Sequence, residues 1–286
     1  MINFDEIVQM IIARGYNAEI KEITKDGIKR DAIMIAKPGC NISPVIYLDV
    51  FNFGDFNGMD AIVDEFIRIA EENSFEEELD LSFLQDWEQV KSKLYLCMGY
   101  RCNFGDDVFT KPFLADIVQY MRISVEDSHI KENIVATVVV SSNMANLWKT
   151  THNLSTDDIF KVATENVQND YHVYDLRTMF MADDTIEALS AEMLILSNEN
   201  RHYGAGVLTC TKTLNEASDA FGGIDFYLVP SSTHEVLAIR PRDEVNAEGL
   251  RTMVQEVNDN ELTRKELLSY SVFFYERESE TVKQAG

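Results

Sequence analysis

Apolar residues near the start of the chain first recur at helical spacing and then alternate, which predicts a helix followed by a hairpin. Asn3 and Glu6 have the spacing of a capping box at the start of this helix, and Gly15 ends it. Two extended runs, 18–24 and 28–36, flank Asp26-Gly27, a dipeptide typical of a tight hairpin turn.

A third strand over 45–50 and a second helix capped by Asn57 complete an α-β-β-β-α order for this part of the chain. The helix carries apolar residues on one face over 62–70 and acids on the opposite face. Eight acids and no base then occur over 71–88, and we predict an acidic helix near 81–90 within this stretch.

The remaining pattern alternates short strands with short helices. The segments are strands over 116–125 and 133–140, a helix from Ser155 with its box partner Asp158, strands over 193–196 and 203–209, a helix from Thr213 boxed by Glu216, strands on either side of Pro230, a helix from Asn246, a short helix from Thr263, a strand over 272–275 and a polar tail from Glu276. This hairpin-rich order predicts an α+β fold with antiparallel sheets and helices packed on one face. We expect two subdomains, over residues 1–148 and 149–286.

The composition is that of an acidic globular chain. Of its 286 residues 45% are hydrophobic, and 49 acids against 25 bases give a formal net charge of -24. This charge repels the phosphates of nucleic acids and anionic membranes, and it attracts basic partners. No apolar run is long enough to span a bilayer, and the first residues lack the basic region of a signal peptide. We therefore expect a cytoplasmic protein that binds neither nucleic acid nor membrane directly.

Neither the cysteines nor the histidines have the spacing of a metal site. Cys97 and Cys102 are not accompanied by a histidine cluster, and the five histidines are scattered along the chain. The sequence thus predicts free thiols in a reducing compartment, with no metal and no cofactor.

The segment Pro230-Ser-Ser-Thr-His-Glu235 holds a nucleophile, a base and a carboxylate close together. Pro230 ends one strand, and Ser231, Ser232, His234 and Glu235 occupy the corner before the next strand. A serine can attack an acyl group when a histidine takes its proton and a carboxylate orients that histidine. In the alternative interpretation the serine hydroxyls satisfy backbone N–H groups in a structural or ligand-binding corner.

Tyr203 is a further candidate ligand-binding residue beside Ser231, Ser232 and His234. His202 would meet His234 if the strand over 203–209 paired beside the strand over 235–239. The glycines of Tyr203-Gly-Ala-Gly206 favour close backbone packing, because no Lys-Ser/Thr follows at the offset of a phosphate-binding loop.

Several stretches carry a resemblance over nearly the whole length of the chain. They are Ile46-Tyr-Leu-Asp-Val-Phe51, the helix over 62–72, Asp80-Leu-Ser-Phe-Leu-Gln-Asp-Trp-Glu-Gln-Val-Lys91, Met193-Leu-Ile-Leu-Ser-Asn198, Tyr203-Gly-Ala205, Asp225-Phe-Tyr-Leu-Val-Pro-Ser-Ser-Thr-His-Glu-Val236 and Ser271-Val-Phe-Phe-Tyr275. In these the chain resembles a family of Firmicutes proteins of unknown function, common in gut clostridia, whose most specific motif is the Pro-Ser-Ser-x-His-Glu corner. The resemblance implies a bacterial cytoplasmic setting and supplies no activity.

The charge, together with the lack of an assembled reactive centre, favours a non-enzymatic binding or regulatory protein that recognises a basic protein partner. One alternative is a hydrolase that uses Ser231 or Ser232 with His234. A second is a small-molecule sensor that holds its ligand between the sheet and the helices of the last third. A third is an inhibitor whose acids over 71–88 mimic nucleic-acid phosphates.

Overall fold

The computed structural model describes residues 3–25, 28–40, 43–49, 51–73, 80–125, 136–176 and 192–285. The chain divides into two compact units, one made of Met1–Phe83 with Val125–Ala136 and the other of Leu84–Ser124 with Thr137–Gly286. This division differs from the expected boundary at 148, because that residue lies inside a helix of the second unit.

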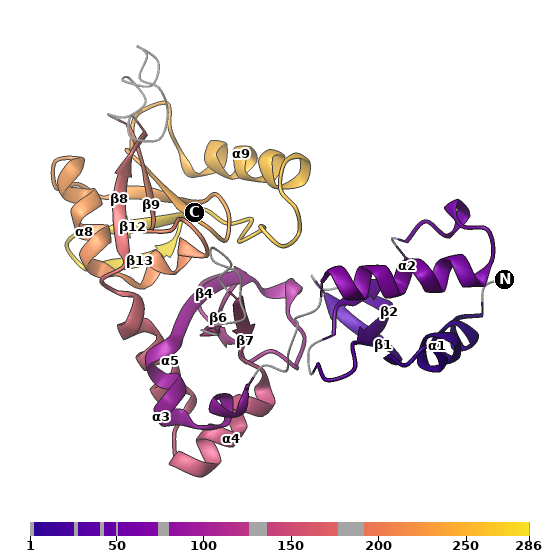
Figure 1. The fold of residues 1–286 in the computed structure, drawn as a ribbon. Coiled ribbons are helices and arrows are strands. Elements are labelled where there is room, and N and C mark those ends of the chain that lie inside the picture. The colour runs from indigo at the N-terminus through magenta and orange to yellow at the C-terminus, as the bar shows by residue number, and fades with distance from the viewer. Residues whose placement is uncertain are drawn as a thin grey trace. The chain divides into compact units, whose positions relative to one another are not determined.

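The described residues of the first unit form two helices and a three-stranded antiparallel sheet of order β1-β2-β3 (Figure 1). Its elements are α1 (Phe4–Ala13), β1 (Asn17–Lys25), β2 (Ile28–Ala36), β3 (Val45–Tyr47), the 3-10 turn η1 (Phe53–Asp55) and α2 (Met59–Glu72). The predicted α-β-β-β-α order is confirmed, whereas the predicted turn residues Asp26-Gly27 lie outside the described part of the chain.

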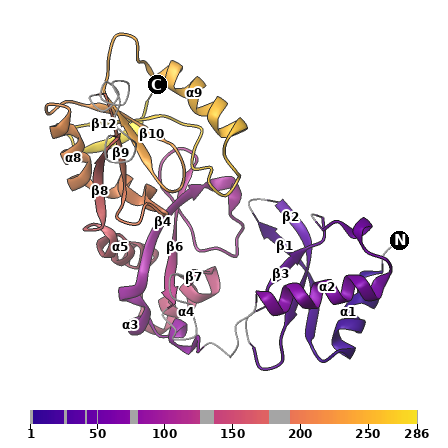
Figure 2. The ribbon, with the colours of Figure 1, turned by 45° about the horizontal axis from the view of Figure 1, so that its top comes forward.

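One apolar core joins the helices of the first unit to its sheet. The core includes Ile7 and Ile11 of α1, Ile33 and Ile35 of β2, Ile46 of β3, and Ile62, Val63 and Phe66 of α2. Ile33 and Ile35 are two residues apart on one strand, so they point to the same face, and both helices cover that face (Figure 2). Burial of each such side chain contributes about 1.5–3 kcal/mol.

Two antiparallel sheets lie in the part of the second unit that the structure describes. The first has the order β4-β6-β5, and β7 also pairs with β6. Its elements and the neighbouring helices are the 3-10 turn η2 (Ser82–Gln85), α3 (Trp87–Val90), β4 (Leu94–Tyr100), the 3-10 turn η4 (Arg101–Asn103), β5 (Lys111–Pro112), β6 (Ile117–Val125), β7 (Ala136–Val139), α4 (Ser142–His152) and α5 (Thr156–Val167).

The prediction of an acidic helix near 81–90 was wrong. The structure has the 3-10 turn η2 and the four-residue α3 in that range. The carboxylate of Asp86 accepts the backbone N–H of Glu88, which starts a new turn and interrupts any longer helix. Of the eight acids over 71–88, those at 76–78 lie outside the described residues. The predicted strand over 133–140 is described only from Ala136 onward, as β7.

The second sheet has six strands in the order β13-β12-β10-β11-β9-β8, and every pairing is antiparallel. Its strands are β8 (Tyr171–Asp175), β9 (Met193–Asn198), β10 (Phe226–Pro230), β11 (Val236–Ile239), β12 (Phe273–Glu276) and β13 (Thr281–Gln284). The 3-10 helix η5 (Gly204–Thr209) and the helices α8 (Thr211–Ala220) and α9 (Ala247–Asn260) accompany them. Helices beside antiparallel sheets make this an α+β fold, as the sequence predicted.

Helix starts follow the cap residues in three of six predicted cases. The side chains of Asn3 and Asn246 accept the expected backbone N–H groups, and Ser155 forms a full capping box with Asp158. The prediction of Asn57 as a helix cap was wrong, because α2 begins after Gly58, which has a φ of +95°. The prediction that a helix starts at Thr213 was also wrong, since α8 already begins at Thr211.

Thr263 does not start a helix either. Its hydroxyl and its backbone N–H both donate to the carboxylate of Glu266, which closes an isolated turn.

Two expected features of the last third are corrected. Residues 204–209 form the buried 3-10 helix η5 and not the predicted strand. The sequence pattern was ambiguous here, because a short buried apolar run lacks the alternation that distinguishes a strand from a helix. The predicted polar tail after Glu276 includes the edge strand β13. The side chains of this strand are mostly exposed and polar, so no alternation of apolar residues indicates it.

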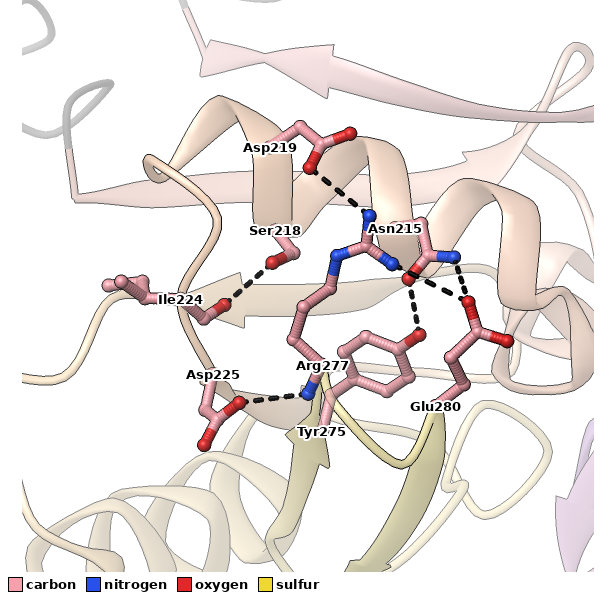
Figure 3. A network of polar contacts seen from close by, with 8 residues as sticks. All are labelled: Asn215, Ser218, Asp219, Ile224, Asp225, Tyr275, Arg277 and Glu280. Atoms are coloured by element: carbon pink, nitrogen blue, oxygen red, sulfur yellow. Dashed lines mark hydrogen bonds and ion pairs between the residues drawn. The ribbon is translucent and has the colours of Figure 1, made fainter.

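A polar network ties the turn between β12 and β13 to α8 (Figure 3). The Tyr275 hydroxyl donates to Asn215 Oδ1 at 2.6 Å, and Asn215 Nδ2 donates to Glu280 at 2.7 Å. Arg277 pairs with Asp219 at 3.4 Å and with Glu280 at 3.5 Å. The turn between β12 and β13 is therefore held against α8 by side-chain contacts.

Candidate functional site

The predicted corner connects two central strands of the six-stranded sheet. Pro230 of β10 pairs with Val236 of β11, so the five residues between them form the hairpin loop. The backbone N–H of Ser232 donates to the Glu235 carbonyl at 3.3 Å and closes this loop.

Both serine hydroxyls of the corner bind within the loop itself. Ser231 Oγ donates to the carboxylate of Glu235 at 3.4 Å, and Ser232 Oγ accepts the backbone N–H of His234 at 3.0 Å. Ser232 is buried, whereas Ser231 is half-buried. The structure gives neither hydroxyl a hydrogen bond to the imidazole of His234 among the described residues.

The imidazole of His234 is held by Tyr203 and His202. Its Nδ1 accepts the backbone N–H of Tyr203 at 3.1 Å, so the neutral ring carries its proton on Nε2. The ring stacks on that of His202, with centroids 4.8 Å apart and an interplanar angle of 22°. His202 and His234 thus meet, but the paired strand on which the sequence analysis made this contact depend does not form, and the loop before η5 brings the two rings together.

The environment of the two rings disfavours their charged forms. Burial lowers the pKa of His234, which the nearby carboxylate of Glu266 partly opposes. The pKa of His202 is lowered by burial, by His234 and by the guanidinium of Arg122. The guanidinium carbon of Arg122 lies 4.5 Å from the centre of the Tyr203 ring, within the range of a cation–π contact.

Hydrogen bonds of the backbone groups of His234 and Thr233 attach the corner to three other segments. The His234 carbonyl accepts Ser197 Oγ at 2.7 Å and the Gly204 N–H at 3.0 Å. The Thr233 N–H donates to the carbonyl of Glu266 at 2.8 Å. The corner therefore fastens β9, η5 and the loop before β12 to the β10–β11 hairpin.

Sequence reasoning found Tyr203, Ser231, Ser232 and His234, and the structure brings these four residues into one region. It missed the partners that come from distant segments. Asn198 accepts the His202 N–H at 3.0 Å, and its side-chain N–H groups donate to the His202 carbonyl at 2.9 Å and to the Tyr95 hydroxyl. No local spacing signals such a partner, because residue 95 lies on β4.

Helix α9 presents a second surface that the sequence pattern did not distinguish from core. Leu250 and Val254 are 8% and 3% exposed, whereas Met253 and Val257 of the same apolar stripe are 40% and 41% exposed. We call Met253, Val257 and the flanking Glu256 the α9 surface.

No helix in the described part of the chain is both long and apolar enough to cross a membrane. Among the described residues, no three His, Cys, Asp or Glu side chains are grouped so that they could hold a metal ion.

A protein-family model matches nearly the whole chain. Residues 2–277 match the model of DUF5688, described as a family of unknown function. No curated protein and no solved structure matches the chain. Since the match spans nearly the whole sequence, the chain belongs to the DUF5688 family of unknown function.

Proposed function

We propose that this protein is a non-enzymatic binding protein that recognises a basic protein partner in the bacterial cytoplasm. The serine hydroxyls of the corner make hydrogen bonds within the loop, and His234 Nδ1 accepts the backbone N–H of Tyr203, which supports a structural role for that segment. The formal net charge of -24 supports recognition of a basic partner. Free thiols at Cys97, Cys102 and Cys210 support a reducing compartment.

The observation that carries this proposal is the α9 surface. The apolar stripe of α9 is wider than the part of the sheet that covers it, so Met253 and Val257 remain exposed one turn apart. A pair of exposed apolar residues beside charged groups suits the apolar face of a partner segment.

The charges around the α9 surface match a basic partner. Glu256 and Glu261 lie at the C-terminal end of α9 and make no ion pair with the described residues, and the last turn of α9 holds no base. Acids near a helix C-terminus oppose the helix dipole, at a cost of about 0.3–1 kcal/mol each. A cationic partner at this end of α9 would offset that cost.

Affinity capture from bacterial lysate at low salt tests the proposal, with the full chain as bait. The matched baits are wild type, Met253→Gln/Val257→Gln, and Ile224→Gln, a control that alters another exposed apolar residue of the same unit. We expect a basic protein to be retained by wild type and the control, to be lost with the double variant, and to elute as salt screens the charges. Equal retention by all three baits, or no basic protein at low salt, would reject the proposal.

A further inference from the structure

A cavity of 420 Å³ in the second unit lies where the C-terminal end of α9 meets the segment after β4. Its lining includes Tyr100 and Tyr270, whose rings pack edge to face with centroids 5.7 Å apart. The Tyr270 hydroxyl donates to the carboxylate of Asp259, also in the lining, at 2.9 Å. The cavity therefore has a preformed aromatic wall with an anionic group beside it.

Two asparagines of the lining have fixed orientations. Asn258 Nδ2 donates to the Ser269 carbonyl at 2.8 Å, and Asn103 Nδ2 donates to the Arg264 carbonyl at 2.6 Å. Because a carbonyl can only accept, the amide nitrogen must face it, and each Oδ1 is turned away as an acceptor. Asn258 is only 7% exposed, and its Oδ1 has no hydrogen-bond partner among the described residues.

The cavity thus combines acceptors with aromatic faces. The acceptors are the Oδ1 atoms of Asn103 and Asn258 and the second carboxylate oxygen of Asp259, since only Oδ1 of Asp259 accepts from Tyr270. Several acceptors with one negative charge suit a group that has several N–H donors and a positive charge. Tyrosine faces attract the same kind of group.

We propose that this cavity binds an alkylammonium or guanidinium group, supplied by a Lys or Arg side chain of the basic partner. The aliphatic stem packs on Tyr100 and Tyr270, and the N–H groups donate to Asn258 and Asp259. Asn258 and Asp259 belong to the last turn of α9, the helix that also carries the α9 surface. The assignment to a partner side chain rests on the proposed function, whereas cation binding by the cavity does not.

Arg264 also lines the cavity and carries the same charge as the proposed ligand. Its side chain is exposed, so solvent screens much of the repulsion. Removal of the Arg264 charge should strengthen cation binding, and removal of the Asp259 charge should weaken it. Opposite effects at two residues of one cavity distinguish electrostatic recognition from a loss of structure.

NMR titrations of the full chain, followed through the side-chain amide signals of Asn103 and Asn258, test the proposal. The probes are spermidine, tetralysine and fully acetylated tetralysine. We expect both amines to shift these signals and the acetylated peptide to leave them unchanged. Asp259→Asn keeps an acceptor for Tyr270 and should weaken amine binding about tenfold, as expected for loss of one charged hydrogen bond. Arg264→Gln should tighten it.

The matched control is Glu216→Gln, which makes the same loss of one acidic charge at an exposed residue of α8, outside the cavity lining and outside the α9 surface. Equal affinity of wild type and Asp259→Asn would overturn the proposal, and so would equal weakening by Asp259→Asn and Glu216→Gln. Binding of spermidine without tetralysine would overturn the assignment to a protein side chain. An Asp259-dependent amine site without any captured basic protein would reject the proposed function alone.

Discussion

The backbone N–H of Tyr203 donates to Nδ1 of His234 at 3.1 Å, so this contact requires the imidazole to lack a proton on that nitrogen. An imidazolium carries N–H groups on both nitrogens, and protonation at Nδ1 therefore breaks the bond. Tyr203 has a φ of +56°, in the left-handed region that a tyrosine rarely adopts. The corner therefore keeps its geometry only while His234 is neutral.

The first prediction is that stability falls as the pH drops below 6.5, the ordinary pKa of histidine. Burial lowers the pKa of His234 and of His202 in the folded state, and Arg122 lowers that of His202 further, while Glu266 partly opposes the shift at His234. The unfolded chain then takes up protons first, so the stabilisation present above pH 6.5 is lost as the pH falls through the folded-state pKa. Each proton taken up on unfolding adds a slope of up to about 1.4 kcal/mol per pH unit.

Urea unfolding at a series of pH values measures this slope. His234→Asn retains an acceptor for the Tyr203 N–H and cannot titrate, so the slope between pH 5 and 6.5 should become shallower. His152→Asn changes an exposed histidine of α4 and serves as the control. A slope that stays the same in His234→Asn would contradict the prediction.

The second prediction concerns Gly204, which fits closely beneath the corner. A Cβ atom there would meet the Ser197 hydroxyl, lie 2.6 Å from Asn198 N and lie 2.7 Å from the His234 carbonyl oxygen. Two of these neighbours are backbone atoms that cannot turn aside, so Gly204→Ala should cost about 1–3 kcal/mol of unfolding free energy. Gly249→Ala is the control, because its Cβ would have no neighbour closer than 3.5 Å and the α9 helix should gain about 0.5–1 kcal/mol. Equal thermal stability of the two variants would contradict this account.

Local patterns predicted the parts of the fold that local forces determine. The stripe of α1, the pairing of β1 with β2, and the caps Asn3, Ser155 and Asn246 each depend on residues a few positions apart. β4 was missed because its apolar residues do not alternate, since this strand is buried along most of its length. β13 was missed for the opposite reason, because an exposed edge strand carries little apolar signal.

At the corner, sequence reasoning identified the residue types and not their partners. The proximity of Ser231, Ser232 and His234 along the chain indicated a reactive group, but hydrogen-bond direction decides which atoms meet. The loop turns the Ser232 hydroxyl to a backbone N–H, and the His234 ring faces a residue 31 positions earlier. The acceptor-lined cavity was equally invisible, because Asn103 and Asn258 lie on separate segments.

The third prediction is that the network beyond β12 contributes to stability. Tyr275→Phe removes the hydroxyl that donates to Asn215 and should cost about 1 kcal/mol, the usual net value of a hydrogen bond in a folded protein. Tyr227→Phe is the control, since that hydroxyl makes no hydrogen bond with the described residues. Differential scanning calorimetry should show a lower melting temperature for Tyr275→Phe alone. Identical melting of both variants would mean that the network adds nothing.

The fourth prediction separates folding from function on α9. Met253→Gln/Val257→Gln should change the free energy of unfolding by less than about 0.5 kcal/mol per residue, because both side chains are already 40% and 41% exposed. Leu250→Ala, on the covered half of the same stripe, should cost about 2–5 kcal/mol. If the two sets of substitutions lower the free energy of unfolding equally, Met253 and Val257 are simply the edge of the core, and the proposed partner surface loses its basis. If only Leu250 matters, the exposed pair needs another reason to be apolar, and a partner that covers it supplies one.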